Sequence, residues 1–329
     1  MRLIHTENLE DIALGAAVLG GGSRGDPDVA KQIGMEALRT SGPVQLVLPD
    51  EISDDCLVAT SALIGTPMEM VEKLPKGTEV VGAFLALQTF VDRAIDYTAA
   101  ADGDGLKSTT PFAVAARLRI PMVDADGIGG AGPEMQMVIP TIYGIAAGPM
   151  AIADEKGNIS IIDAVDPAWT DRLARTICTE MGSTAMIAAC LMSGRQLKAS
   201  MTPGTLTRAE RIGQHIRQAR QQHQNPIEAL RKLTGGVELF RGNVVDVQRR
   251  TESGCVRGEA TFQGTGKWTG SQLTLRFENE HLVAVEDRAD LITVLDPETA
   301  EPVTTKNLQY GVRAVILGMQ RESPARSYG

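Results

Sequence analysis

The pattern of hydrophobic and polar positions changes near residue 236. Before this point, short apolar runs alternate with segments in which apolar residues recur every three or four positions, the spacing of one buried helix face. After it, apolar and polar residues alternate in short runs separated by turn residues, which is typical of half-buried strands. The sequence therefore predicts two regions of different architecture.

Strands alternate with helices in the first region. Short apolar runs predict strands at 44–48, 56–60, 120–126 and 159–165, and amphipathic segments predict helices at 3–18, 29–39, 80–95 and 111–118. Because strands that are separated by helices usually form a parallel sheet with both faces covered, this order favours an α/β fold. We therefore expect a three-layer αβα domain over residues 1–165.

The second predicted domain, residues 166–329, begins with a helical lead-in over 167–234. Within this lead-in, Ala185–Leu191 shows an apolar helical pattern. Thr207 and Glu210, three positions apart, are typical of a capping box that opens a further helix. The short strands that follow predict an all-β, barrel-like unit over 236–318. They are expected at 240–249, 256–262, 272–278, 281–285, 291–295 and 312–317.

The stretch Ile120–Met137 combines a strand end with two aspartates, four glycines and a Pro-Glu pair. Asp124 and Asp126 are two positions apart, so on a strand they would point to the same side, about 6–7 Å from each other. Pro133 suits the first position of a helix and Glu134 its first turn. The pattern predicts a site whose carboxylates take up a proton, a metal ion or a basic partner. A solvated strand end followed by a Gly-rich turn fits the same spacing.

Glycine-rich loops also precede predicted helices at 19–27 and 102–108. Such a loop presents backbone N–H donors and the positive end of a helix dipole to an anion or a carbonyl oxygen. Because ligands bind outside the carboxyl ends of parallel strands, we expect these loops and 65–67 to meet 124–134 in one cleft. The predicted ligand-binding residues are Gly20, Gly21, Gly22, Ser23, Arg24, Asp26, Gly65, Thr66, Asp104, Lys107 and Gly127. In that cleft, Arg24 and Lys107 would relieve the repulsion between the two carboxylates.

Composition narrows the class of partner. A chain of 329 residues exceeds the usual size of a single core, which favours two domains. The net charge of −9 disfavours nucleic acid as a partner. No stretch approaches the about 20 apolar residues that a membrane span needs, and the N-terminus carries acids where a signal peptide would be apolar. We therefore expect a cytoplasmic protein with a small-molecule substrate and no membrane partner.

Several short motifs are spread over nearly the full length of the chain. They include Leu19-Gly20 with Gly25-Asp26-Pro27, Val71-Glu72-Lys73-Leu74-Pro75, Val123-Asp124-Ala125-Asp126-Gly127, Pro133-Glu134-x-Gln136-Met137, Asp154-Glu155-Lys156-Gly157-Asn158 and Phe240-Arg241-Gly242. Through these motifs the chain resembles the S-methyl thiohydantoin desulfurase family, a bacterial family associated with hydantoin utilisation. The resemblance implies an α/β N-terminal domain, a β-barrel-like C-terminal domain, and hydrolysis of a thiohydantoin that releases a thiol and leaves a hydantoin.

The leading hypothesis is a hydrolase-like enzyme that acts on a small cyclic amide or thioimidate. Asp124 or Asp126 would serve as general base or metal ligand, and Glu134 would position water or a ring N–H. Amides of the Gly-rich loops would stabilise the developing negative charge. The cysteines and histidines are dispersed, and oxygen ligands from Asp124 and Asp126 do not distinguish a hard cation from zinc. A divalent metal and its identity therefore stay open.

Two alternatives stay open. The family has other residues where this chain has Ser23-Arg24, Gly130 with Gly132, and 103–107, so a non-catalytic ligand-binding or accessory subunit of a hydantoin-utilisation system also fits. Such a subunit would act as a homo-oligomer or with a hydantoinase-type partner. The spacing of Gly127, Gly129 and Gly132 after a strand matches a dinucleotide-binding loop, but Pro133 follows at once and the aspartates would repel a pyrophosphate. We therefore expect no nucleotide cofactor.

Overall fold

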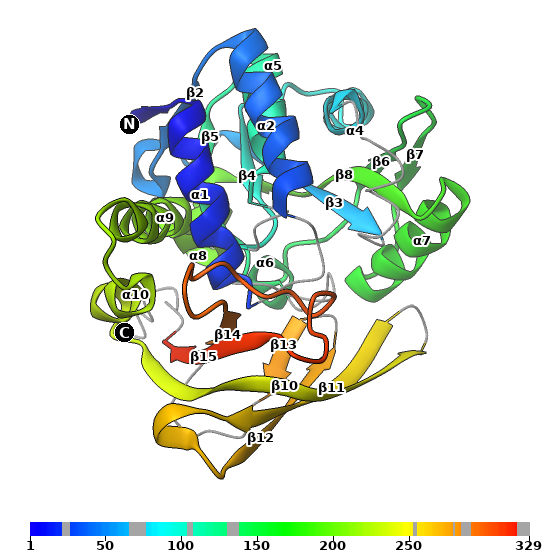
Figure 1. Cartoon of the computed structure of the whole chain (residues 1–329). Coiled ribbons are helices and arrows are strands. Elements are labelled where there is room, and N and C mark those ends of the chain that lie inside the picture. The colour runs from blue at the N-terminus through cyan, green and yellow to red at the C-terminus, as the bar shows by residue number, and fades with distance from the viewer. Residues whose placement is uncertain are drawn as a thin grey trace, which may run out of the picture.

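The fold consists of two sheets and the helices that pack on them (Figure 1). This computed structural model describes residues 1–21, 27–65, 77–103, 108–129, 138–252, 255–278, 280–283 and 291–320. Within these ranges, the first sheet has nine strands and the second has six. The predicted mixed α/β class is therefore confirmed.

The first sheet is parallel in its centre and antiparallel toward one edge. Its strands are β1 (Arg2–Ile4), β2 (Val44–Val47), β3 (Leu57–Gly65), β4 (Tyr97–Ala100), β5 (Met122–Asp126), β6 (Met150–Ala153), β7 (Ile159–Ile162), β8 (Thr184–Ser193) and β9 (Thr202–Pro203). They lie in the order β1-β2-β5-β4-β3-β8-β6-β7, and β9 pairs with the end of β5. Strands β2, β5, β4 and β3 run parallel, so their carboxyl ends share one edge of the sheet.

Helices cover both faces of this sheet. They are α1 (Thr6–Leu19), α2 (Pro27–Ser41), α4 (Thr78–Phe90), α5 (Thr110–Leu118), α6 (Ile139–Ile142), α7 (Pro167–Glu180), α8 (Gly194–Ser200), α9 (Thr205–Gln221) and α10 (Pro226–Thr234). One apolar core joins the sheet to α1, α2, α4, α5, α9 and α10, and a second joins its other face to α7 and α8. Within the described part of the chain, no helix combines the length and apolar character needed to cross a membrane.

One predicted helix is wrong. Ala185–Leu191 lies in β8, which pairs with β3 and β6 inside the first sheet. Strand β8 is buried on both faces, so nearly all of its side chains are apolar and no alternation is left in the sequence. A continuous apolar run cannot be assigned to a strand or a helix from periodicity alone. The first sheet thus contains strands from both sides of residue 165.

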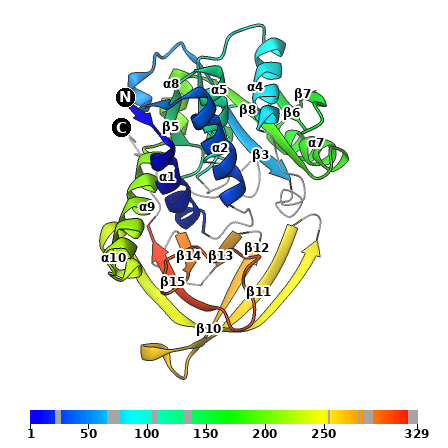
Figure 2. The ribbon, with the colours of Figure 1, turned by 45° about the horizontal axis from the view of Figure 1, so that its top comes forward.

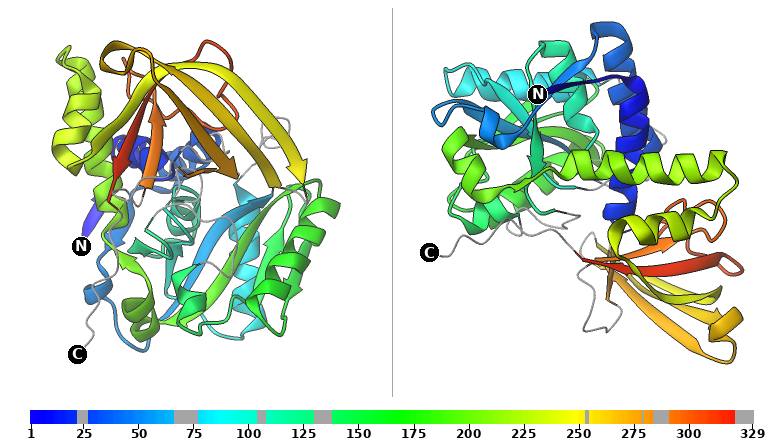
Figure 3. Two further views of the ribbon diagram at one scale, coloured as in Figure 1. Left: turned by 90° about the horizontal axis from the view of Figure 1, so that it is seen from below. Right: turned by 90° about the vertical axis from the view of Figure 1, so that its left-hand side faces the viewer.

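The second sheet is antiparallel and curved (Figures 2 and 3). It is formed by β10 (Val237–Glu252), β11 (Cys255–Gly264), β12 (Gln272–Glu278), β13 (Glu280–Val283), β14 (Leu291–Leu295) and β15 (Arg313–Met319). The predicted strands of this region are therefore confirmed. The hydrogen-bonded order β13-β12-β11-β10-β15-β14 leaves β13 and β14 at opposite ends, without a paired register between them in the described segments. Closure into a barrel stays a prediction.

Helices α1 and α9 cross in direct backbone contact (Figures 1 and 2). A Cβ atom on Gly15 would lie 1.8 Å from the carbonyl oxygen of Ala209, and one on Gly213 would lie 2.0 Å from that of Asp11. Two hydrogen bonds of 2.8 Å from the guanidinium of Arg217 to the buried carboxylate of Asp11 join the same helices. This crossing fixes the start of α9 beside the end of α1.

Candidate functional site

Two buried aspartates end β5 at the carboxyl edge of the first sheet. Val123 and Ala125 pack into the core beneath α7 and α8. The alternating positions, Asp124 and Asp126, face the side of the sheet that carries α9, and each is only 1% exposed. Burying two carboxylates costs free energy unless hydrogen bonds compensate, so their partners decide what each can do.

Asp124 caps α9. The residue before this helix is Gly204, whose φ of 74° is left-handed and which has no side chain to cap the helix. One carboxylate oxygen of Asp124 instead accepts the N–H of Leu206 at 2.9 Å and that of Thr207 at 3.3 Å. The hydroxyl of Thr207 donates to the other oxygen. Burial raises the pKa of Asp124, and the hydrogen bonds from Thr207 and Leu206 offset part of that rise.

The predicted capping box at Thr207 is therefore wrong. The helix begins two residues earlier, at Thr205, and its cap comes from β5 rather than from its own sequence. Glu210, the predicted partner of Thr207, accepts hydrogen bonds from Arg2 and Asn8 instead. A sequence pattern cannot reveal a cap that is supplied from more than eighty positions away.

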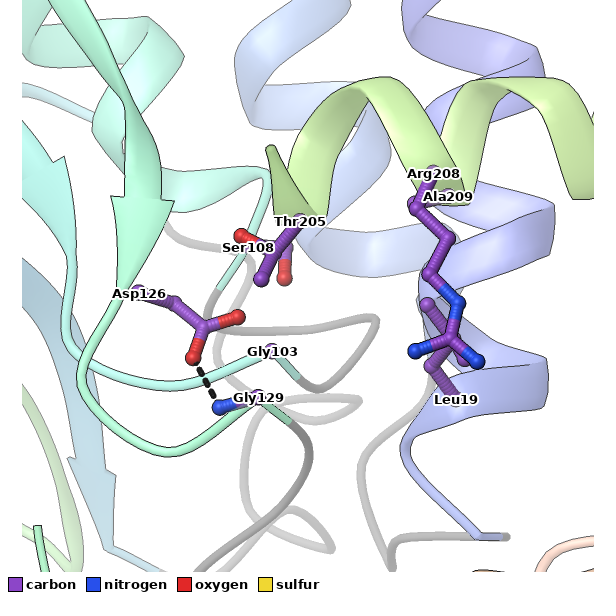
Figure 4. A pocket seen from close by; sticks show the side chains of 8 residues that line it. All are labelled: Leu19, Gly103, Ser108, Asp126, Gly129, Thr205, Arg208 and Ala209. Atoms are coloured by element: carbon purple, nitrogen blue, oxygen red, sulfur yellow. Dashed lines mark hydrogen bonds between the residues drawn. The ribbon is translucent and has the colours of Figure 1, made fainter. Parts of the chain in front are cut away.

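Asp126 closes the turn after β5. One of its carboxylate oxygens accepts the N–H of Ile128 at 2.8 Å and also that of Gly129. The same two amides belong to the Gly-rich stretch that could otherwise bind a phosphate, and here they bind a carboxylate of their own chain. The second oxygen of Asp126 points toward Ser108 and Thr205 (Figure 4).

A small pocket lies in front of Asp126. Its lining comes from the end of α1, the segment after β4, the residues just before α5, the end of β5 with the turn after it, and the start of α9: Leu19, Gly103, Ser108, Asp126, Gly129, Thr205, Arg208 and Ala209. The cavity has a volume of about 10 Å³. This is room for about one water molecule. Its walls thus combine a carboxylate, two hydroxyls and a guanidinium around a space that fits a water molecule.

Both hydroxyls of the pocket are buried. Ser108 is 2% exposed, and its hydroxyl lies 3.4 Å from the carbonyl oxygen of Asp102, to which it donates. Thr205 is 7% exposed, and its hydroxyl has no hydrogen-bond partner among the residues that the structure describes. Arg208 donates to the carbonyl oxygen of Gln320 at 3.0 Å. None of these three lining residues was predicted from the sequence; a threonine directly after a helix-starting glycine was the available signal for Thr205.

Two of the predicted glycines serve close backbone packing. A Cβ atom on Gly65 would lie 2.1 Å from the carbonyl oxygen of Ser183, and the φ of Gly65 is 120°. A Cβ atom on Gly127 would lie 2.5 Å from the carbonyl oxygen of Ala101. Gly127 therefore lets the loops after β4 and β5 touch, which brings Gly103 and Asp126 into one pocket.

Parts of three of the four predicted loops lie close together in the described ranges, and a single ligand-binding cleft stays a prediction. The end of α1 with Gly20 and Gly21, the loop at Gly103 and the turn at Asp126 meet at the pocket or directly beside it. Gly65 ends β3 on the same edge, but β4 separates β3 from β5 and Gly65 does not line the pocket. The remaining predicted residues lie outside the described ranges: Gly22, Ser23, Arg24, Asp26, Thr66, Asp104, Lys107 and Glu134.

Among the residues with described positions, no three His, Cys, Asp or Glu side chains come together in an arrangement that could hold a metal ion. Both oxygens of Asp124 and one oxygen of Asp126 are instead hydrogen-bonded, to backbone amides and to Thr207.

Comparison with known proteins places the chain in a family. Residues 7–164 match the S-Me-THD-like N-terminal domain, and residues 165–327 match the S-Me-THD-like C-terminal domain. A crystal structure of a protein from Chromobacterium violaceum, structural genomics target CvR68, has the same fold with a TM-score of 0.77. It is 21% identical, and the match covers 98% of this chain and 93% of that one. A search of curated proteins gives no match. The chain belongs to the S-Me-THD-like family.

Proposed function

We propose that the chain is a hydrolase-like enzyme that acts on a small cyclic amide or thioimidate, such as an S-alkyl thiohydantoin or a hydantoin. The observation that carries the proposal is the carboxylate of Asp126 at the wall of a water-sized cavity lined by two hydroxyls. Family membership supports the substrate class, because the family name refers to S-methyl thiohydantoin. The location at the carboxyl ends of parallel strands is where ligands bind in open α/β sheets.

In the proposed reaction, Asp126 acts as general base. Two backbone N–H donors hold its carboxylate and offset part of the cost of keeping a negative charge buried. The carboxylate takes one proton from water, and the water oxygen attacks the ring carbon that bears the sulfur. The carbon–sulfur bond then breaks, and the departing thiolate takes the proton back from Asp126, which leaves the hydantoin and a neutral thiol.

Asp124 has a different role in this scheme. Its carboxylate fixes the first turn of α9, and that turn contributes Thr205 and Arg208 to the pocket. We therefore assign Asp124 as a positioning residue and keep Glu134 as the group proposed to bind water or a ring N–H.

The test is turnover of a panel of hydantoins and S-alkyl thiohydantoins by the purified protein and by Asp126→Asn. Asparagine keeps an acceptor oxygen for the Ile128 and Gly129 amides but cannot take up a proton. The proposal expects thiol release by the wild type and its loss in the variant. The absence of turnover on every member of the panel would overturn it.

A non-catalytic ligand-binding or accessory subunit is the second candidate. It is favoured by the use of Asp124, one of the two residues predicted as general base, as a helix cap. This alternative expects a hydantoin to raise the thermal unfolding temperature without being converted. Co-purification with a hydantoinase-type partner would support it further.

A further inference from the structure

We infer that Thr205 is a positioning residue that holds the hydrolytic water against Asp126, an inference that rests on the proposed function. Thr205 is the first residue of α9 and lies within the part of the chain that matches the C-terminal family domain. The proposed base, Asp126, lies within the N-terminal match. The site would therefore be completed only by both parts of the chain.

The hydroxyl of Thr205 is placed to bind a molecule in the cavity. It is buried, it lines the pocket, and it has no hydrogen-bond partner in the described ranges. A buried hydroxyl without a partner costs about 1–3 kcal/mol. Burial alone does not define a site, since Thr202 and Thr293 have unpartnered hydroxyls as well. Thr205 differs from both because its hydroxyl shares a cavity with a carboxylate (Figure 4).

The size of that cavity suits a water molecule rather than a substrate. A volume of about 10 Å³ is too small for a five-membered ring but suffices for a water molecule. A buried water typically makes about three hydrogen bonds to polar groups around it. Asp126, Ser108 and Thr205 provide that number of polar side chains.

The donors and acceptors around the cavity can orient one water molecule. Ser108 already donates its proton toward the carbonyl oxygen of Asp102, so its oxygen can accept one from water. Asp126 is an acceptor and can receive the second water proton. The proton of Thr205 is then donated to one lone pair of the water oxygen. The remaining lone pair of the water oxygen is then left for attack on a substrate carbon.

The start of α9 has a fixed position in the fold. It is held by the Asp124 cap and by the contact of Gly15 with the backbone of Ala209, and the contacts of Gly213 and Arg217 with Asp11 fix the helix further along. A hydroxyl on the first residue of this helix therefore has a fixed position relative to β5. Fixed placement of a reacting water is the kind of organisation that speeds a hydrolytic step.

Three variants test the inference. Thr205→Val replaces the hydroxyl by a methyl group of similar size, Thr205→Ser keeps the hydroxyl, and Thr202→Val removes an equally buried, unpartnered hydroxyl that does not line the cavity. We expect Thr205→Val to lower kcat about tenfold, the value of one hydrogen bond, with KM unchanged. Thr205→Ser should restore most of kcat, and Thr202→Val should match the wild type. Equal kcat values for Thr205→Val and the wild type would overturn the inference, as would equal losses in both valine variants.

A second measurement does not depend on activity. High-resolution crystal structures of the substrate-free wild type and of Thr205→Val should differ by one ordered water within hydrogen-bonding distance of both Thr205 Oγ1 and Asp126. If no substrate of the panel is turned over, the proposed function fails, and these structures still decide whether Thr205 holds a water. A wild-type cavity with no ordered water beside Thr205 would overturn the inference.

Discussion

The carboxyl edge of the first sheet and the interior of the second sheet are both buried, but they are built from opposite kinds of residue. The second sheet encloses Phe240, Phe262, Leu275, Phe277 and Ile316 in an apolar cluster. The edge of the first sheet instead buries two carboxylates and two hydroxyls within one strand end and its neighbours. Buried polar groups cost stability unless they are paired. The apolar cluster of the second sheet therefore indicates a role in stability, and the polar edge of the first sheet indicates a role in chemistry.

The substitution Asp126→Asn at the edge of the first sheet should have the largest effect on kcat. Loss of a general base lowers kcat by about 100- to 10,000-fold. The turn after β5 should stay intact because asparagine still accepts the amide hydrogen bonds. Steady-state kinetics together with thermal unfolding would check this, and an inactive variant that is also unfolded would not support a catalytic role.

Phe262→Ala should show the opposite profile. The Phe262 side chain is fully buried in the second sheet, and truncation of such a residue lowers the free energy of unfolding by about 3–5 kcal/mol. The kcat of the folded variant should equal that of the wild type. The control is Arg276→Ala, which removes an exposed ion pair with Glu259 and should change the unfolding free energy by less than about 1 kcal/mol. A specific loss of kcat in folded Phe262→Ala would show that the two regions are not separate in function.

Asp124→Ala should lie between these extremes. Removing a helix cap and leaving buried amides unpaired costs about 1–3 kcal/mol of unfolding free energy. Because α9 carries Thr205 and Arg208, kcat should fall as well. Chemical denaturation and kinetics measured on one preparation would test both parts, and an unchanged stability would contradict the assignment of Asp124 as the cap.

A smaller effect should appear in the pH dependence of stability. Burial raises the pKa of Asp124 above the usual 3.8. The folded state therefore binds this proton more tightly than the unfolded state, so the associated stabilisation is complete below 3.8 and is lost as the pH rises through the folded pKa. Denaturation of wild type and Asp124→Asn over a pH series should show the wild type losing stability relative to the variant as the pH rises. A constant difference would contradict the raised pKa.

The sequence was sufficient to predict those elements whose structure is determined by neighbouring residues in the chain. Turn residues and alternation located the strands of the second sheet, and the helical lead-in predicted from residue 167 begins where α7 does, with the Asp166 side chain as its cap. The two aspartates on β5 were also found, because strand periodicity places them on one side.

The remaining features depend on contacts between distant positions. The strand at Ala185–Leu191 is buried by neighbours on both faces, so its sequence carries no alternation. The cap of α9 comes from Asp124, and the pocket position of Thr205 follows from the crossing of α1 and α9. Local patterns contain no information about any of these three tertiary arrangements.

The most direct test of a water-based reaction at this edge uses isotopic labelling. Purified protein would be incubated with an S-methyl thiohydantoin in water labelled with heavy oxygen, and the products would be analysed by mass spectrometry. We expect one labelled oxygen in the hydantoin for each thiol released, with neither product formed by Asp126→Asn. Thiol release without label in the hydantoin, or equal release by the variant, would contradict it.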